Sequence, residues 1–94
     1  MNRFDPARAA AALDALLEKF EAKTADDRVI RDSAQALFDA PSVSAKDKGF
    51  AAYIVSNVYA RLDDKTSSCR WAHAAVAKVR DEAYTVLEQA MCAP

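Results

Sequence analysis

The sequence predicts an all-α fold of four helices, paired as two antiparallel helical hairpins in a compact bundle or a short stack. The chain is alanine-rich: 22 of its 94 residues are Ala, the strongest helix former, and only one is Gly. Apolar residues also recur at the three- and four-residue spacing of amphipathic helices. The length suits a single domain over residues 1–94, with a hairpin over 5–40, a loop over 41–44 and a second hairpin over 45–92.

A first helix is expected over about 6–23. Asp5 and Pro6 are a typical helix start, because aspartate accepts hydrogen bonds from unpaired backbone amides and proline fits the first helical position. The face expected to enter the core carries Ala9, Leu13, Leu16, Leu17 and Phe20.

A second helix is expected from Thr24, where Asp27 three residues later completes an approximate capping box. Pro41 ends it and begins the loop. The stripe predicted to be buried consists of Val29, Ile30, Ser33 and Leu37.

The third helix is expected to follow Ser44 as its cap, and it is apolar around half its circumference, which is typical of a central helix. Its apolar residues are Phe50, Ala51, Ile54, Val55, Val58, Tyr59 and Leu62. The remaining edge carries Tyr53, Asn57 and Arg61 at four-residue steps.

A last helix is predicted to run unbroken to about Met91, after a turn at 63–65 and a cap at Thr66, Ser67 or Ser68. Its predicted core face consists of Ala72, Ala75, Val76, Val79, Ala83, Val86, Leu87 and Ala90.

Charge and composition exclude several function classes. Lys and Arg total 13 against 14 Asp and Glu, so the near-neutral chain lacks the general attraction that nucleic-acid and membrane-surface binders use. One glycine excludes a glycine-rich phosphate loop, and one histidine excludes a multi-histidine metal site within the chain. No apolar run predicts a membrane span or signal peptide. We expect a soluble cytoplasmic protein, and the few large apolar residues favour a homodimer that completes a thin core.

The expected length of the last helix decides whether the two cysteines can form a disulfide with each other. On one unbroken helix Cys69 and Cys92 would lie about 35 Å apart and could not pair unless the helix breaks, so free thiols in a reducing cytosol are expected. A redox sensor or an intermolecular bridge is the alternative. Cys69 and His73, four residues apart, could supply two zinc ligands, but no further ligands stand at a suitable spacing. We therefore expect no metal, no cofactor and no catalytic site.

The second hairpin resembles a tetratricopeptide repeat over residues 49–82. The positions that carry the resemblance are Val55, Ser56, Tyr59, Ser68 and Ala75, which stand at the family's aliphatic, small, tyrosine, small and alanine positions. The chain departs from the family at Ala52, Ala72 and Arg80, where two aromatics and a closing proline are usual. A shift of 42 residues also superposes the two hairpins weakly, which favours a helical hairpin repeat. The resemblance implies a scaffold that binds a peptide or protein rather than an enzyme.

The function expected from these features is that of a small non-enzymatic protein–protein interaction module: an adaptor, inhibitor or regulator that binds a protein partner. One expected surface is the side of the last helix with Trp71 and Lys78, unless a neighbouring helix or the preceding loop covers Trp71. The other is the row Tyr53, Asn57 and Arg61, which alternatively forms a hydrogen-bonded seam between helices.

Two other function classes stay open. A transcription-associated or nucleic-acid-linked regulator would use the turn at 63–66 and the following Arg70, His73 and Lys78, although the acidic residues of that turn oppose phosphate. A metal- or thiol-using protein would need Cys69 and His73 together with ligands shared between subunits.

Overall fold

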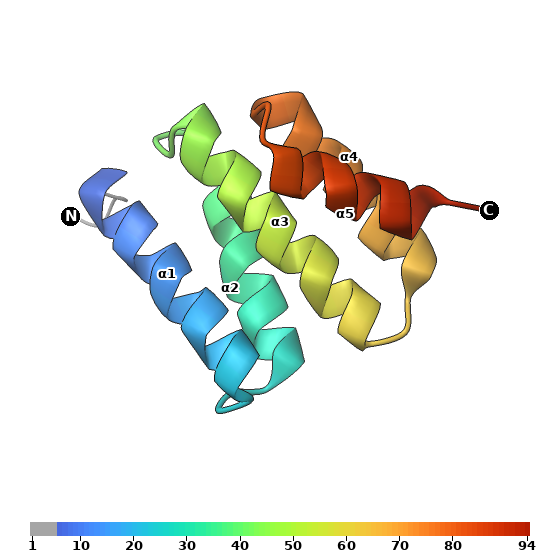
Figure 1. The fold of residues 1–94 in the computed structure, drawn as a ribbon. Coiled ribbons are helices and arrows are strands. Elements are labelled where there is room, and N and C mark those ends of the chain that lie inside the picture. Colours follow the sequence, from blue (N-terminus) through green and yellow to red (C-terminus); the bar gives the residue numbers. More distant parts are fainter. Residues whose placement is uncertain (1–5) are drawn as a thin grey trace.

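The computed structural model describes residues 6–94, which form five α-helices and no β-strand (Figure 1). The helices are α1 (Pro6–Ala22), α2 (Asp27–Asp39), α3 (Ala45–Arg61), α4 (Lys65–Lys78) and α5 (Glu82–Cys92). The all-α prediction is confirmed, and the prediction of four helices is wrong, because the last expected helix is two. The predicted cap Asp5 lies outside the described residues.

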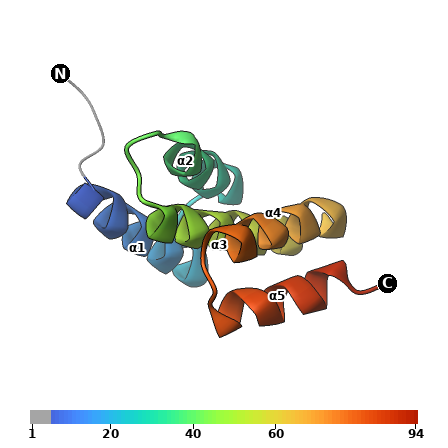
Figure 2. The ribbon, with the colours of Figure 1, turned by 90° about the horizontal axis from the view of Figure 1, so that it is seen from above.

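Helix α3 is central, as its composition predicted, and it packs against α1, α2 and α4. Seen from above, α3 and α4 form a middle layer with α2 on one side and α5 on the other (Figure 2). Helix α5 packs mainly on α4. None of the helices in the described part of the chain is long and apolar enough to cross a membrane.

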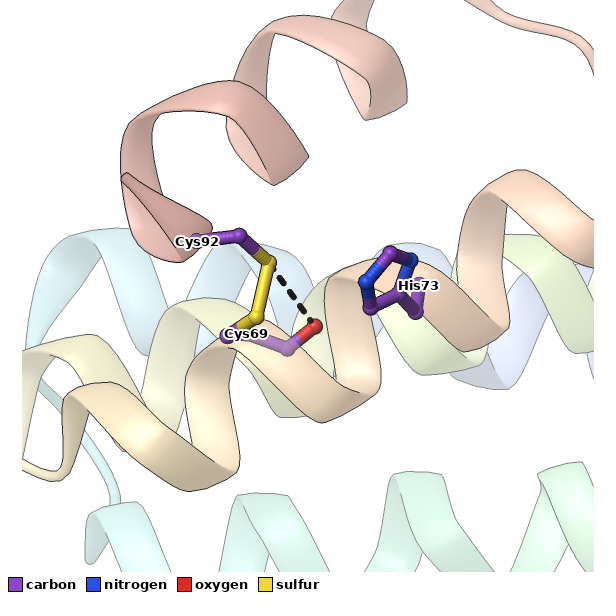
Figure 3. Close-up of side chains that lie close together, drawn as sticks. All are labelled: Cys69, His73 and Cys92. Atoms are coloured by element: carbon purple, nitrogen blue, oxygen red, sulfur yellow. Dashed lines mark hydrogen bonds between the residues drawn. A yellow bond between two sulfur atoms is a disulfide. The ribbon is translucent and has the colours of Figure 1, made fainter. Parts of the chain in front are cut away.

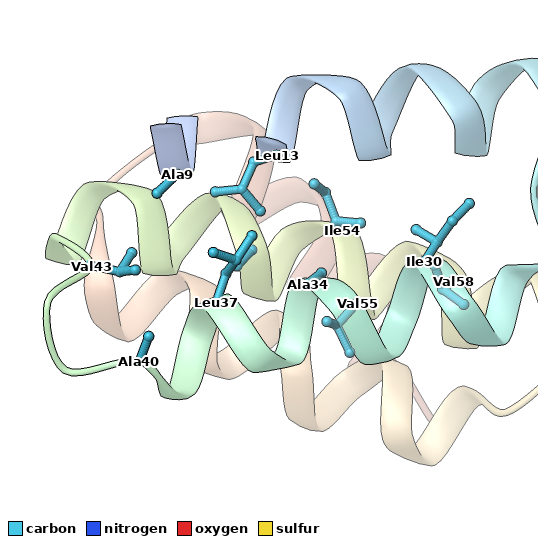
Figure 4. Packing of buried hydrophobic residues seen from close by; sticks show 11 residues of the cluster. Ala9, Leu13, Ile30, Ala34, Leu37, Ala40, Val43, Ile54, Val55 and Val58 are labelled. Atoms are coloured by element: carbon cyan, nitrogen blue, oxygen red, sulfur yellow. The ribbon is translucent and has the colours of Figure 1, made fainter. Parts of the chain in front are cut away.

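The main core lies where α1, α2 and α3 meet (Figure 4). Its largest fully buried side chains are Leu13, Ile30, Ile54, Val55 and Val58. On α2 the predicted core residue Val29 is misplaced: it is 59% exposed, because the buried face of this helix follows Ile30, Ala34 and Leu37 instead.

The α3–α4 contact is built from small residues. Ser56 and Ser68 are fully buried, and each hydroxyl donates a 2.8 Å hydrogen bond to the backbone carbonyl of the other residue. Both buried hydroxyls therefore have a hydrogen-bond partner, so their burial leaves no unsatisfied polar group. Because the serine side chains are small, the two helices can approach closely.

Capping residues explain the observed helix starts. Ser44 caps α3 as predicted, since its Oγ accepts from the backbone N–H of Asp47 at 3.1 Å. The other two predicted caps are wrong by two residues or more. Asp26, not Thr24, caps α2, and Asp64, ahead of the predicted hydroxyl residues, caps α4 by accepting from the Ser67 amide at 3.0 Å. These hydrogen bonds from Ser67 lower the pKa of Asp64.

The break between α4 and α5 is the main departure from the predicted fold. Val79 and Asp81 are extended, and Asp81 caps α5 by accepting from the Ala83 amide at 2.8 Å. The connection passes close to α3 at the only glycine of the chain: a Cβ built on Gly49 would lie 2.7 Å from Val79 Cγ2. The chain then reverses, so α5 runs back along α4 (Figure 1).

Candidate functional site

The predicted surface on the last helix is partly covered. Trp71 is half-buried and packs edge-on against Phe38 of α2, with ring centroids 5.0 Å apart. Lys78 is exposed, and its Nζ lies 5.7 Å from the same Phe38 ring. A neighbouring helix, α2, therefore partly covers the indole, which was one of the alternatives for this residue, and the contact joins the two hairpins.

The predicted row on α3 is divided between two environments. Arg61 donates two hydrogen bonds to the Asp27 carboxylate and lies 3.6 Å from the centroid of the Phe20 ring, so it ties α3 to α2 and α1. These bonds hold the pKa of Asp27 below its ordinary value. Asn57 donates to the Tyr53 carbonyl at 2.8 Å within the helix. Arg61 thus belongs to a seam between helices, which is the alternative weighed for the row.

Tyr53, at the other end of the row, faces α5. Its ring lies 5.1 Å from that of Tyr84 and 6.4 Å from that of Phe50, measured between centroids. Tyr84 is buried, and its burial raises the pKa of its phenol. These aromatic rings anchor the first turn of α5 on α3.

A shallow groove of about 520 Å³ runs between Tyr53 and α5. The α5 residues that line it are Glu82, Ala83, Val86, Leu87 and Ala90. The last four were predicted to be core, and that prediction is wrong: Val86 is 56% exposed, Ala83 and Ala90 are exposed, and Leu87 is half-buried. We call these four residues the α5 stripe. Within α5, all of which the structure describes, Tyr84 alone is buried.

Cys69 and Cys92 form a disulfide between α4 and α5, so the prediction of free thiols is wrong. The reversal at 79–81 brings their Cα atoms to 4.8 Å, within the range that a disulfide spans. Cys92 Sγ also lies 3.5 Å from the Cys69 carbonyl oxygen (Figure 3). Because the two cysteines are paired, free thiols no longer support the expectation of a reducing compartment.

His73 and Glu88 extend this cluster by one helical turn. Cys69 and His73 are four residues apart on α4, and Cys92 and Glu88 are four residues apart on α5. Because the two helices are antiparallel, Cys69 lies opposite Cys92 and His73 lies opposite Glu88. His73 Nδ1 pairs with Glu88 Oε2. One ring nitrogen of His73 is turned toward the two sulfurs (Figure 3), and the ligand atoms of the two cysteines and His73 lie within 4.8 Å of one another. Sequence reasoning missed Cys92 and Glu88 here, although their matched spacing was visible.

Comparison of the chain with family models, with curated proteins and with solved structures found no match. The tetratricopeptide resemblance therefore stays a prediction. Of the positions that carry it, Ser56, Ser68 and Ala75 are buried in the α3–α4 hairpin and Tyr59 is half-buried.

Proposed function

We propose that the protein is a non-enzymatic interaction module that binds an amphipathic helix of a protein partner along the α5 stripe. The observation that carries the proposal is that these four apolar side chains line an open groove instead of entering the core. Exposed apolar residues in a contiguous patch mark interaction sites more often than scattered ones do.

The spacing of the stripe favours a helical partner. Ala83, Val86, Leu87 and Ala90 stand at i, i+3, i+4 and i+7, the pattern with which one helix meets another. Their small and branched side chains form a ridge about two turns long, and an apolar helix face fits beside such a ridge. Glu82 at the start of the groove favours a basic residue at the matching end of the partner.

The stripe is also held in place before any partner arrives. Tyr84 anchors the first turn of α5 on α3, and the disulfide fixes its last turn to α4. Binding to a preorganised surface avoids the entropy cost of ordering a flexible helix. Tyr53 supplies an aromatic side chain at the edge of the groove, of the type that dominates interface energies. Trp71 and Lys78 lie against Phe38, so we place the principal binding face on α5 and Tyr53.

The test uses two valines of similar exposure. A photo-crosslinking residue is placed at Val86, 56% exposed on α5, or at Val29, 59% exposed on α2, in cells of the source organism. We expect a discrete crosslinked protein from position 86 only, and its loss when Leu87→Asp is added. The captured protein is then tested for an amphipathic helix by binding of the isolated peptide.

A second copy of the chain is one outcome of the same test. In that case light scattering shows a dimer that Val86→Asp converts to a monomer, while Val29→Asp does not. The proposal fails if position 86 gives neither a crosslinked partner nor a dimer, or if both positions capture the same proteins equally.

A further inference from the structure

We propose that the α4–α5 hairpin, once its disulfide is reduced, binds one Zn²⁺ ion through Cys69, Cys92 and His73, with Glu88 orienting the imidazole. This site would lie within one chain, unlike the subunit-shared site considered from the sequence. It is independent of the α5 stripe, which lines the groove toward α3.

The ligand set matches the chemistry of zinc. Zn²⁺ favours thiolate sulfur and imidazole nitrogen in a tetrahedral arrangement, with bonds of about 2.3 Å to sulfur and 2.0–2.1 Å to nitrogen. Ligand atoms around such an ion stand about 3.5–3.8 Å apart. The three ligand atoms already lie within 4.8 Å of one another, so side-chain rotations of the two freed cysteines suffice to complete the geometry.

Glu88 supplies what metal-binding histidines generally require. Its Oε2 pairs with His73 Nδ1, which leaves Nε2 as the ring nitrogen available to an ion. A carboxylate on the distal nitrogen fixes the tautomer and the ring orientation and makes the imidazole a better ligand. The Glu88 side chain is 21% exposed and that of His73 is 66% exposed, so the orienting group is sheltered while the metal can enter from the surface.

The charges and electrons of the step balance. A dithiol reductant delivers two electrons and two protons, the S–S bond breaks, and the reductant becomes a cyclic disulfide. Zn²⁺ then displaces the two thiol protons and binds two thiolates and a neutral imidazole, so the ion and its three protein ligands carry no net charge, and the Glu88 carboxylate beside them adds one negative charge. The fourth tetrahedral position is left to water. The ion would join α4 to α5 at the place where the disulfide joins them in the oxidised chain.

The experiment compares oxidised and reduced protein. The chain is reduced with dithiothreitol, desalted without oxygen, and titrated with Co²⁺ as a spectroscopic probe and then with Zn²⁺ against a chromophoric chelator. We expect one ion per monomer in the reduced protein alone, with the thiolate charge-transfer and ligand-field bands of tetrahedral Co²⁺.

Variants that keep both cysteines separate this site from simple dithiol chemistry. Because His73 is exposed, His73→Ala should fold normally, and we expect it to weaken Zn²⁺ binding at least 30-fold. Glu88→Gln should weaken it about 10-fold. The control Arg80→Ala, exposed in the connection between the helices, should leave the affinity unchanged. The proposal is overturned if the reduced chain binds no ion, if one ion is shared by two chains, or if His73→Ala binds Zn²⁺ as tightly as the natural sequence.

Discussion

Removing the Cys69–Cys92 disulfide should make α5 open locally much more often while the rest of the fold stays intact. The crosslink closes a loop with a sequence separation of 23 residues, for which the chain-entropy relation gives about 3 kcal/mol of stability. Helix α5 has little else to replace it, because within this fully described helix Tyr84 alone is buried. A loss of about 3 kcal/mol in the free energy of opening corresponds to amide exchange about 100-fold faster.

The assay is hydrogen exchange by mass spectrometry on the double variant Cys69→Ala/Cys92→Ala. Peptides from α5 should exchange about 100-fold faster than in the oxidised chain, and urea unfolding should show a free energy lower by about 3 kcal/mol. Oxidised protein, and protein reduced in the presence of a metal chelator, serve as the two references. The reasoning is refuted if α5 keeps its protection in the variant, or if α3 loses protection as fast as α5 does.

Two further predictions concern single contacts. Gly49→Ala should destabilise the fold by about 1–3 kcal/mol because its Cβ would lie 2.7 Å from Val79 Cγ2. In a Val79→Ala background the same change should cost less, because that methyl group is gone and only the contacts with Val79 Cβ at 3.3 Å and Tyr84 Cε2 at 3.4 Å remain; urea unfolding of the double-mutant cycle measures both, and equal effects in the two backgrounds would contradict the contact. The lowered pKa of Asp27 means that its pairing with Arg61 stabilises the fold above about pH 3.8, and that this contribution is lost as the pH falls further. The variant Asp27→Asn should therefore lose less stability between pH 7 and pH 3 than the natural sequence does in urea unfolding. Parallel losses in the two proteins would count against the pairing.

The first three helices were predictable because their boundaries depend on local chemistry. Ser44 caps α3 at the expected position, and the apolar spacing of α3 correctly made it central. The errors in these helices, such as the cap of α2 at Asp26 instead of Thr24, are small. They arise because aspartate and threonine both cap helices well and lie close together in the chain.

The candidate site could not be predicted because it depends on the break at 79–81. The apolar spacing continues from Val79 to Ala83 without interruption, and no glycine or proline marks the end of α4. The available signal was the pair Asp81 and Glu82, because an aspartate followed by a second acidic residue is typical of the first residues of a helix. Tertiary contacts favour the break over one continuous helix. These contacts are the room that Gly49 leaves for Val79, the burial of Tyr84, and the disulfide.

This one break explains the linked errors. An unbroken helix places the cysteines far apart, sends the α5 stripe into the core, and leaves Cys69 and His73 without further ligands. With the chain reversed, the disulfide forms, the stripe lines an open groove, and Cys92 and Glu88 join the cluster.

The most direct test of this account is a peptide map of protein purified without reductant, unfolded, alkylated and digested with trypsin. Cleavage after lysine and arginine separates residues 66–70, which contain Cys69, from residues 81–94, which contain Cys92. An antiparallel α4–α5 hairpin predicts that these two peptides are recovered joined by a disulfide from the monomer. Recovery of the two peptides joined only in a covalent dimer, or as alkylated thiols even after the purified chain has been freed of metal and oxidised, would contradict the reversal from which both proposals follow.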